Sequence, residues 1–153
     1  MPVLYHHPMS TASRFVRLIF SEYGVQSELI EEQIWEKRKD FLAVNPAGTL
    51  PVFVDDNMRA LCGPTVISEF LDETSGVLKR DRRLLAEDPF QRAEIRRLTE
   101  WFLVKMEQDV TRPLVRERVF KLFMSPDQGG GAPDSKVLRT SRSNIRQHLR
   151  YLT

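Results

Sequence analysis

Residues 45–53 combine two prolines and a glycine with a short β-branched and aromatic run, which suits a loop that could bind another peptide. Pro51 lies directly before this run, at a position where it removes a backbone donor that a sheet would otherwise use. A proline here favours a turn of special geometry, such as a cis Leu50–Pro51 bond. We expect such a bond to leave the backbone of Val52 available to an extended peptide. The alternative is an ordinary turn before an edge strand.

A second candidate group is the hydroxyl of Ser10, which lies close to the expected start of a helix. Either Ser10 or Ser13 can cap a helix that runs to about Tyr23 and is closed by Gly24. The dipole and the free amides of a helix N-terminus favour an anion there. The alternative is that both serines only cap the helix. His6 is interpreted as a partly buried strand residue rather than a base.

Arginines recur near the end of the chain at spacings of three and four, which places them on one helix face. These are Arg139, Arg142, Arg146 and Arg150, and further charge is added by Arg112, Arg116, Arg118 and Lys121. Few aromatic residues are interleaved, and no helix-turn-helix or stacking platform is evident, so nucleic acid is not expected. We expect an acidic protein partner instead, with an ordinary solvated helix surface as the alternative.

The elements that would position residues 1–76 alternate between strands and helices. Strands are predicted at 3–5 and 27–33, a hairpin at 52–61, and helices at about 10–23, 35–43 and 65–74. This βαβαββα order predicts an α/β domain, a small mixed sheet with helices on its faces in the thioredoxin-like arrangement. In the last helix we expect four residues to face inward, Val66, Ile67, Phe70 and Leu71.

The second half of the chain reads as entirely helical. Asp88-Pro89 is typical of a helix start, Pro113 is expected to interrupt that helix, and residues 114–124 form another basic helical piece. Residues 125–134 contain three successive glycines and predict a flexible loop. A helix resumes at Ser135. Because no further helices follow to cover its apolar faces, we expect this all-helical domain to be truncated.

Charge is distributed unevenly along the chain. Residues 1–76 carry 6 basic and 11 acidic side chains (net −5), and residues 77–153 carry 17 and 10 (net +7), which together give the overall +2. A shift of this size near Ser75-Gly76 predicts a domain boundary. We therefore expect one domain at 1–76, a linker at 77–87 and a second domain at 88–153.

The composition argues against disulfide-bonded, zinc-binding, membrane-spanning and secreted proteins. The 41% hydrophobic and 29% charged residues are ordinary for a globular protein. A single cysteine, Cys62, excludes an internal disulfide and a cysteine-based zinc site, and we expect no metal. No apolar run approaches the length of a membrane span, and the start of the chain lacks the pattern of a signal peptide. A cytoplasmic location is expected.

The pattern Asn-Pro-x-Gly-x-x-Pro-Val at 45–52 resembles the loop of glutathione S-transferases whose cis-proline precedes the backbone that grips the cysteinyl part of glutathione. The resemblance covers residues 3–76 well and the following helices more loosely. It implies a thioredoxin-like domain followed by an all-helical domain, with glutathione as the cofactor. Residues 7–17 are similar to the serine-type enzymes, which implies that Ser10 stabilises the reactive thiolate. Pro51, Val52 and Thr65 would then help to bind glutathione.

The sequence departs from the family at the start of the helix after the hairpin. Gly63 and Pro64 take the register of an acidic or glutamine residue and a serine, which hold the γ-glutamyl end of glutathione. Losing a charge-assisted hydrogen bond of this sort costs about 1.5–3 kcal/mol. Because about 1.4 kcal/mol corresponds to a factor of ten, we expect glutathione to bind roughly ten- to hundred-fold more weakly. Thr65 could compensate in part.

The arginine-rich residues 111–121, the His-His-Pro start and the Gly63-Pro64 replacement together resemble one bacterial branch of the superfamily. That branch comprises transferase-like division proteins that bind FtsZ, the tubulin-like filament former. The resemblance implies a binding and regulatory role, an acidic or filamentous partner and a possible homodimer, without established transferase activity. The alternative is a serine-type transferase that conjugates glutathione to small electrophiles.

Overall fold

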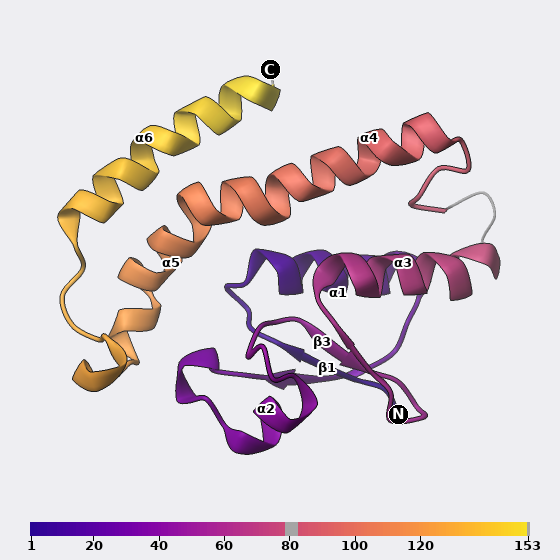
Figure 1. Cartoon of the computed structure of the whole chain (residues 1–153), viewed down its shortest axis with the longest axis horizontal. Helices are drawn as coiled ribbons and strands as arrows, with labels where there is room; N and C mark the ends of the chain where they lie inside the picture. The colour runs from indigo at the N-terminus through magenta and orange to yellow at the C-terminus, as the bar shows by residue number, and fades with distance from the viewer. Residues whose placement is uncertain (79–82, 153) are drawn as a thin grey trace. The chain divides into compact units, whose positions relative to one another are not determined.

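The computed structural model describes residues 1–78 and 83–152, and their contacts form two compact units, Met1–Pro89 and Phe90–Thr153 (Figure 1). This division falls later than the predicted boundary near Ser75-Gly76, because residues 83–85 are bound to the first unit. Part of the predicted linker at 77–87, residues 79–82, lies outside the described residues.

The first unit is built on a sheet of four strands, in the order β2-β1-β3-β4. The strands are β1 (Val3–His6), β2 (Glu28–Glu31), β3 (Val52–Val54) and β4 (Ala60–Cys62). β1 pairs with β2 in parallel and with β3 antiparallel, and β3 pairs with β4 antiparallel. With helices α1 (Thr11–Tyr23), α2 (Lys39–Val44) and α3 (Pro64–Thr74) between them, the predicted βαβαββα order is confirmed.

Helices cover both faces of this sheet. Figure 1 shows α1 and α3 on one face and α2 on the other. Because successive strand residues point to opposite faces, Leu4 and Phe53 pack against α1 and α3, whereas Tyr5, Val52 and Val54 pack with Phe41 of α2. A short 3₁₀ turn, η1 (Ile34–Glu36), precedes α2, so the predicted irregular helix at 35–43 is two separate pieces.

Helix α1 forms where the pattern of apolar residues predicts it. Ser10 is its N-cap, and Gly24 ends it in the left-handed conformation with φ 69°. The residues that it buries include the four expected apolar ones, Val16, Ile19, Phe20 and Tyr23. This helix therefore fixes the position of Ser10 at its own first turn.

Helix α3 buries a different face from the one predicted. Ile67 and Leu71 are buried as expected, but Val66 is 50% exposed and Asp72 is buried in its place. Successive residues of an α-helix are about 100° apart, so Val66 falls outside the arc that Ile67 and Leu71 define. The prediction for Val66 is wrong for this reason, and a carboxylate enters the interior instead.

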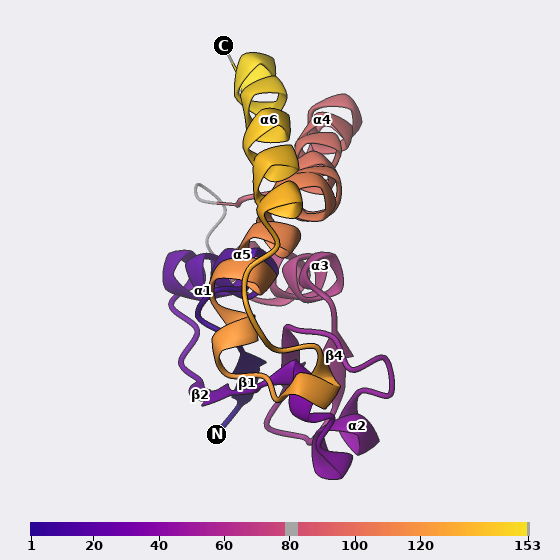
Figure 2. The same cartoon turned by 90° about the vertical axis from the view of Figure 1, so that its left-hand side faces the viewer.

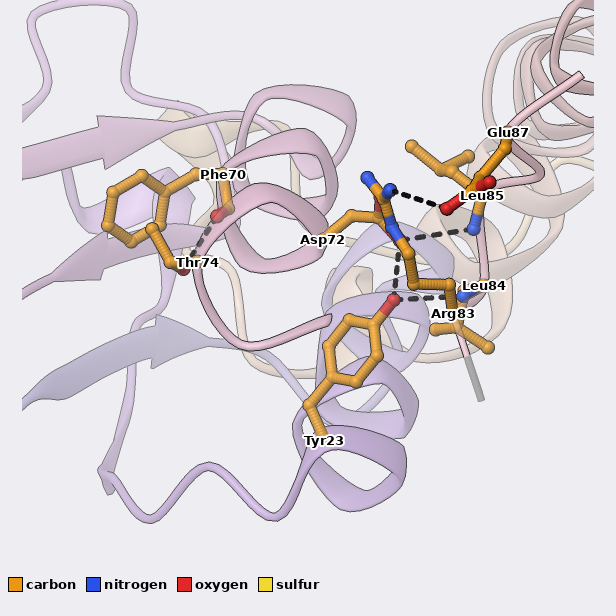
Figure 3. Close-up of polar contacts among 8 residues, drawn as sticks. All are labelled: Tyr23, Phe70, Asp72, Thr74, Arg83, Leu84, Leu85 and Glu87. Carbon is orange, nitrogen blue, oxygen red and sulfur yellow. Dashed lines mark hydrogen bonds and ion pairs between the residues drawn. The ribbon is translucent and has the colours of Figure 1, made fainter. Parts of the chain in front are cut away.

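Asp72 is the centre of a buried polar network, shown in Figure 3. Its Oδ1 accepts the hydroxyl of Tyr23 at 2.6 Å and the backbone N–H of Leu85 at 3.1 Å. Its Oδ2 accepts Nη2 and Nε of Arg83 at 2.6 and 3.0 Å. The Tyr23 oxygen in turn accepts the N–H of Leu84 at 2.9 Å. We call these five residues the Asp72 network; it holds residues 83–85 against α1 and α3.

The second unit begins with a long helical stretch. Helix α4 (Pro89–Glu100) starts at the predicted position and continues as a π-helical segment, η3 (Trp101–Thr111), and then as α5 (Arg112–Arg118). The change from η3 to α5 falls where the interruption at Pro113 is predicted: the proline occupies the first turn of α5, where its missing N–H is not needed. The basic helical piece expected to reach residue 124 ends at Arg118 and is followed by a 3₁₀ turn, η4 (Phe120–Leu122).

The glycine-containing segment 125–134 is tied at several points. It contains the 3₁₀ turn η5 (Pro126–Gln128), closed by reciprocal hydrogen bonds between Ser125 and Gln128. The Glu117 carboxylate accepts Nζ of Lys121 at 2.6 Å and the backbone N–H of Asp134 at 2.6 Å. The buried carboxylate of Glu117 thus holds the last residue of the segment, for which a flexible loop is predicted, against α5.

Helix α6 (Ser135–Leu152) completes the described part of the second unit and packs against η3 and α5 (Figure 2). Trp101 stacks on Tyr151 with ring centroids 4.3 Å apart, and Nε2 of His148 lies 3.2 Å from Oδ2 of Asp109. None of the helices in the described ranges is both long and apolar enough to cross a membrane.

Candidate functional site

Three loops meet where strands of the sheet end, at a place that we call the common edge. Tyr5 of β1 lies opposite Val52 of β3, and Val52 lies opposite Cys62 of β4. The end of β1, the start of β3 and the end of β4 are therefore neighbours. The loops that adjoin them are residues 7–10, residues 48–51 and the start of α3. The pairing of the strands thus brings the neighbourhoods of Ser10, Pro51 and Thr65 to a common edge.

Ser10 caps α1 and keeps a donor for another group. Its Oγ accepts the N–H of Ser13 at 3.2 Å, and its own N–H donates to the carbonyl of His7 at 3.0 Å. Capping uses a lone pair of the hydroxyl, so the O–H itself can still donate. The two roles considered for Ser10, helix cap and partner of an anion, are therefore compatible in this geometry.

His7 organises the loop before Ser10. Its ring Nδ1 accepts the backbone N–H of Met9 at 3.1 Å. Its backbone N–H donates to Oγ of the buried Ser13 at 3.3 Å. Burial lowers the pKa of His7, and the nearby Glu31 carboxylate partly opposes this shift. His6 is also buried, as expected, and its pKa is lowered by burial and by Arg17.

The proline loop is held by Asn45. This buried side chain donates to the carbonyl of Thr49 at 2.8 Å and accepts the N–H of Ala47 at 3.2 Å. The Leu50–Pro51 bond that follows is cis. Asparagine at the start of a turn is a recognised signal for such side-chain to backbone bonds, so this role could have been inferred from the sequence.

The backbone of Val52 lies between two neighbouring strands. Val52 is fully buried, and β3 is flanked by β1 and β4, so the sheet occupies both sides of the strand at this residue. The pairing of Val52 with a bound peptide, expected from a cis Leu50–Pro51 bond, stays a prediction. Leu50, on the other side of Pro51, precedes the strand and lies in the loop.

The start of α3 carries no acidic or hydroxyl cap. Gly63 is its N-cap, with φ 95° and ψ 148°, and Pro64 occupies its first turn. The Gly63 N–H donates to the Pro51 carbonyl at 3.0 Å, which links this helix start directly to the proline loop. Thr65 is exposed at the next position. Gly63 and Pro64 thus stand at the common edge without any side-chain hydrogen-bonding group.

The arginines singled out in the second unit are all exposed. On α6 they lie on the face opposite the buried Ser141 and His148, and the helix contains no acidic residue in its 18 positions. On α5 the one acid, Glu117, is buried and paired with Lys121. We define the basic faces as the exposed arginines of these two helices, Arg112, Arg116, Arg118, Arg139, Arg142, Arg146 and Arg150.

Lys121 does not belong to the basic faces. Its side chain is only 16% exposed and its Nζ is bound to Glu117. As for metal ions, no group of three or more histidine, cysteine, aspartate or glutamate side chains within residues 1–78 and 83–152 could hold one.

Comparison with known proteins assigns the chain to a family. Residues 4–80 match the model for the N-terminal domain of glutathione S-transferases. The chain belongs to the glutathione S-transferase family. It is 34% identical to FtsZ-localized protein A of Caulobacter vibrioides, over 97% of this chain and 63% of that protein.

Two solved structures of the family are closely similar. A glutathione S-transferase from Sinorhizobium meliloti is 83% identical, with a TM-score of 0.97; the match covers 99% of this chain and 66% of that chain. FzlA from C. crescentus is 35% identical, with a TM-score of 0.85; the match covers 98% of this chain and 64% of that chain. The chain therefore spans slightly less than two thirds of the length of these relatives.

Proposed function

We propose that this protein is a transferase-like binding protein that acts in bacterial cell division by docking on FtsZ filaments. The observation that carries the proposal is α6, whose arginines are exposed on one face and whose 18 positions include no acid. The likeness to FtsZ-localized protein A supports FtsZ as the partner. The setting would be the cytoplasm, and a homodimer would present the basic faces twice.

The exposed charges of α5 and α6 suit an acidic partner. The burial of Glu117 leaves arginines as the exposed charges of α5. Like charges four positions apart on a helix repel one another, so such a row of arginines does not stabilise the helix. Such a row increases the rate of association with a partner of opposite charge and favours that partner over others.

Glutathione chemistry is the weaker candidate function. Ser10 and the three converging loops favour a serine-type transferase, in which the Ser10 hydroxyl would donate to the glutathione sulfur. The loop backbone near Leu50 and the side chain of Thr65 would contribute further contacts. Gly63 and Pro64, however, leave the γ-glutamyl end without charged or hydroxyl ligands. We therefore propose weak glutathione binding and no efficient turnover.

Co-sedimentation of the full-length protein with polymerised FtsZ tests the proposal. We expect the protein to pellet with the filaments at low salt, and to pellet less at physiological salt, where the screening length falls from about 30 Å to about 8 Å. Pelleting that does not change with salt, or no pelleting at either salt, contradicts the proposal.

Calorimetric titration with glutathione separates the second candidate from the first. The binding proposal predicts weak or undetectable heat. Micromolar binding, together with conjugation activity that Ser10→Ala abolishes, would instead establish the transferase.

A further inference from the structure

The imidazole of His7 is part of the loop that carries Ser10. Two hydrogen bonds close the loop itself: the Met9 backbone N–H donates to His7 Nδ1 at 3.1 Å, and the Ser10 backbone N–H donates to the His7 carbonyl at 3.0 Å. A third joins the loop to α1, since the backbone N–H of His7 donates to Ser13 Oγ at 3.3 Å. Of these, only the first depends on the protonation state of a side chain.

The bond to Met9 determines the form of the ring. A backbone N–H can only donate, so Nδ1 must present a lone pair, and the neutral ring must carry its proton on Nε2. Nε2 lies 3.7 Å from Oε1 of Glu31 on the adjacent strand β2. The ring is thus placed between a donor on one side and a carboxylate on the other.

The surroundings keep this ring neutral. His7 is 8% exposed, and the edge of its ring approaches the ring of Trp35 in η1 at 5.8 Å. Burial lowers its pKa, against the opposing effect of Glu31. Next to it along the chain is His6 of β1, whose own pKa is lowered by burial, by Arg17 of α1 and by His7. A positive charge on His7 therefore disfavours one on His6.

We propose that His7 is a positioning residue that fixes the Ser10 loop through its bond with Met9, and that protonation of His7 releases that loop. Protonation places a hydrogen on Nδ1, so two donors then face each other and the bond with Met9 is lost. The imidazolium is attracted instead toward the Glu31 carboxylate. This inference does not depend on the proposed function, since it concerns the loop itself and not its ligand.

Nuclear magnetic resonance of the ¹⁵N-labelled full-length protein tests the proposal directly. At pH 7 the ring nitrogens of His7 should report the Nε2–H form. As the pH is lowered, the amide signals of Met9, Ser10 and Ser13 should shift with the same midpoint as the ring, below the ordinary value of 6.5. The Nδ1–H form at pH 7 overturns the proposal. So does a Met9 signal that stays constant while His7 titrates, or the absence of any His7 titration before the protein unfolds.

Two variants separate positioning from simple packing. His7→Asn keeps a side-chain acceptor but does not titrate, so Met9 should stay protected and the shared pH transition should vanish. His7→Leu removes the acceptor, and exchange of the Met9 amide hydrogen should become about ten-fold faster at every pH. His6→Gln is the matched control and should leave the Met9 transition in place. A transition that persists in His7→Asn, or disappears in His6→Gln, overturns the assignment to His7, and the wild-type titration decides if His7→Leu does not fold.

Discussion

Tyr23 and Asp72 meet inside the first unit, where the tyrosine hydroxyl donates to the carboxylate at 2.6 Å. The two residues are 49 positions apart and join the last turn of α1 to α3. The same pair receives the backbone N–H groups of Leu84 and Leu85. One buried contact therefore holds two helices together and anchors the chain that continues toward α4.

Tyr23→Phe should destabilise the protein, because it removes the donor to Asp72 and the acceptor for Leu84 at once. Buried polar groups that lose their partners cost about 1–3 kcal/mol, so the free energy of unfolding should fall by about that amount. Denaturant unfolding measures it. Tyr5→Phe, on a half-buried strand residue outside the Asp72 network, is the control and should have a smaller effect. Equal effects from the two substitutions would contradict the assigned role of the network.

Stability should fall in acid partly because of Asp72. Burial by itself raises the pKa of this carboxyl, but hydrogen bonds from Tyr23, Leu85 and Arg83 outweigh it and hold the pKa below its ordinary value of 3.8. The ionised form is thus favoured in the folded state. Its contribution is present above pH 3.8 and is lost as the pH falls through the lower, folded-state value.

The substitution Asp72→Asn should therefore cost the most near neutral pH, and its cost should shrink below pH 3.8. Denaturant unfolding at a series of pH values measures this difference. Glu73→Gln, on the exposed neighbour in α3, should leave the acid profile of the wild type almost unchanged. A cost of Asp72→Asn that is the same at all pH values would show that Asp72 does not titrate in this way.

Much of the fold follows from local patterns in the sequence. The apolar spacing of α1, the Ser10 and Gly24 caps, and the start of α4 at Pro89 each depend on residues within a turn or two. These features are predictable because they require no knowledge of which segments meet.

What the sequence did not reveal depends on contacts between distant residues or on the direction of a side chain. The position of β3 between β1 and β4, for example, is a property of the whole sheet. The Asp72 network joins three segments that no local pattern connects. The His7 to Met9 bond is local, yet it depends on the orientation of one ring, for which the sequence gives no signal.

Pro64→Ser should strengthen glutathione binding, because it returns a hydroxyl to the first turn of α3 at the common edge. A gain of about 1.4 kcal/mol corresponds to ten-fold tighter binding, which calorimetric titration would measure. Pro133→Ser, on an exposed proline of the second unit, is the control and should change nothing. If Pro64→Ser binds glutathione no better than the wild type, the missing hydroxyl does not account for weak binding.

Gly63 is a less suitable position at which to restore a family ligand. A side chain at Gly63 would meet no atom within 4 Å, but its φ of 95° and ψ of 148° are strained for any residue with a Cβ. Gly63→Ala should therefore lower stability by about 1–3 kcal/mol through backbone strain alone. Unfolding that is unchanged by this substitution would show that the loop relaxes to another conformation.

The most direct test of the central claim is filament binding by a protein whose α6 charge is reversed. In full-length Arg142→Glu, Arg146→Glu protein, stability should stay within about 0.5 kcal/mol of the wild type, since both side chains are exposed. The control reverses two exposed cations of the first unit, Arg14 and Lys39, with the same change in net charge. We predict that the α6 variant no longer co-sediments with FtsZ filaments at low salt, while the control pellets like the wild type. Undiminished co-sedimentation of a well-folded α6 variant would contradict the claim that this face binds the filament.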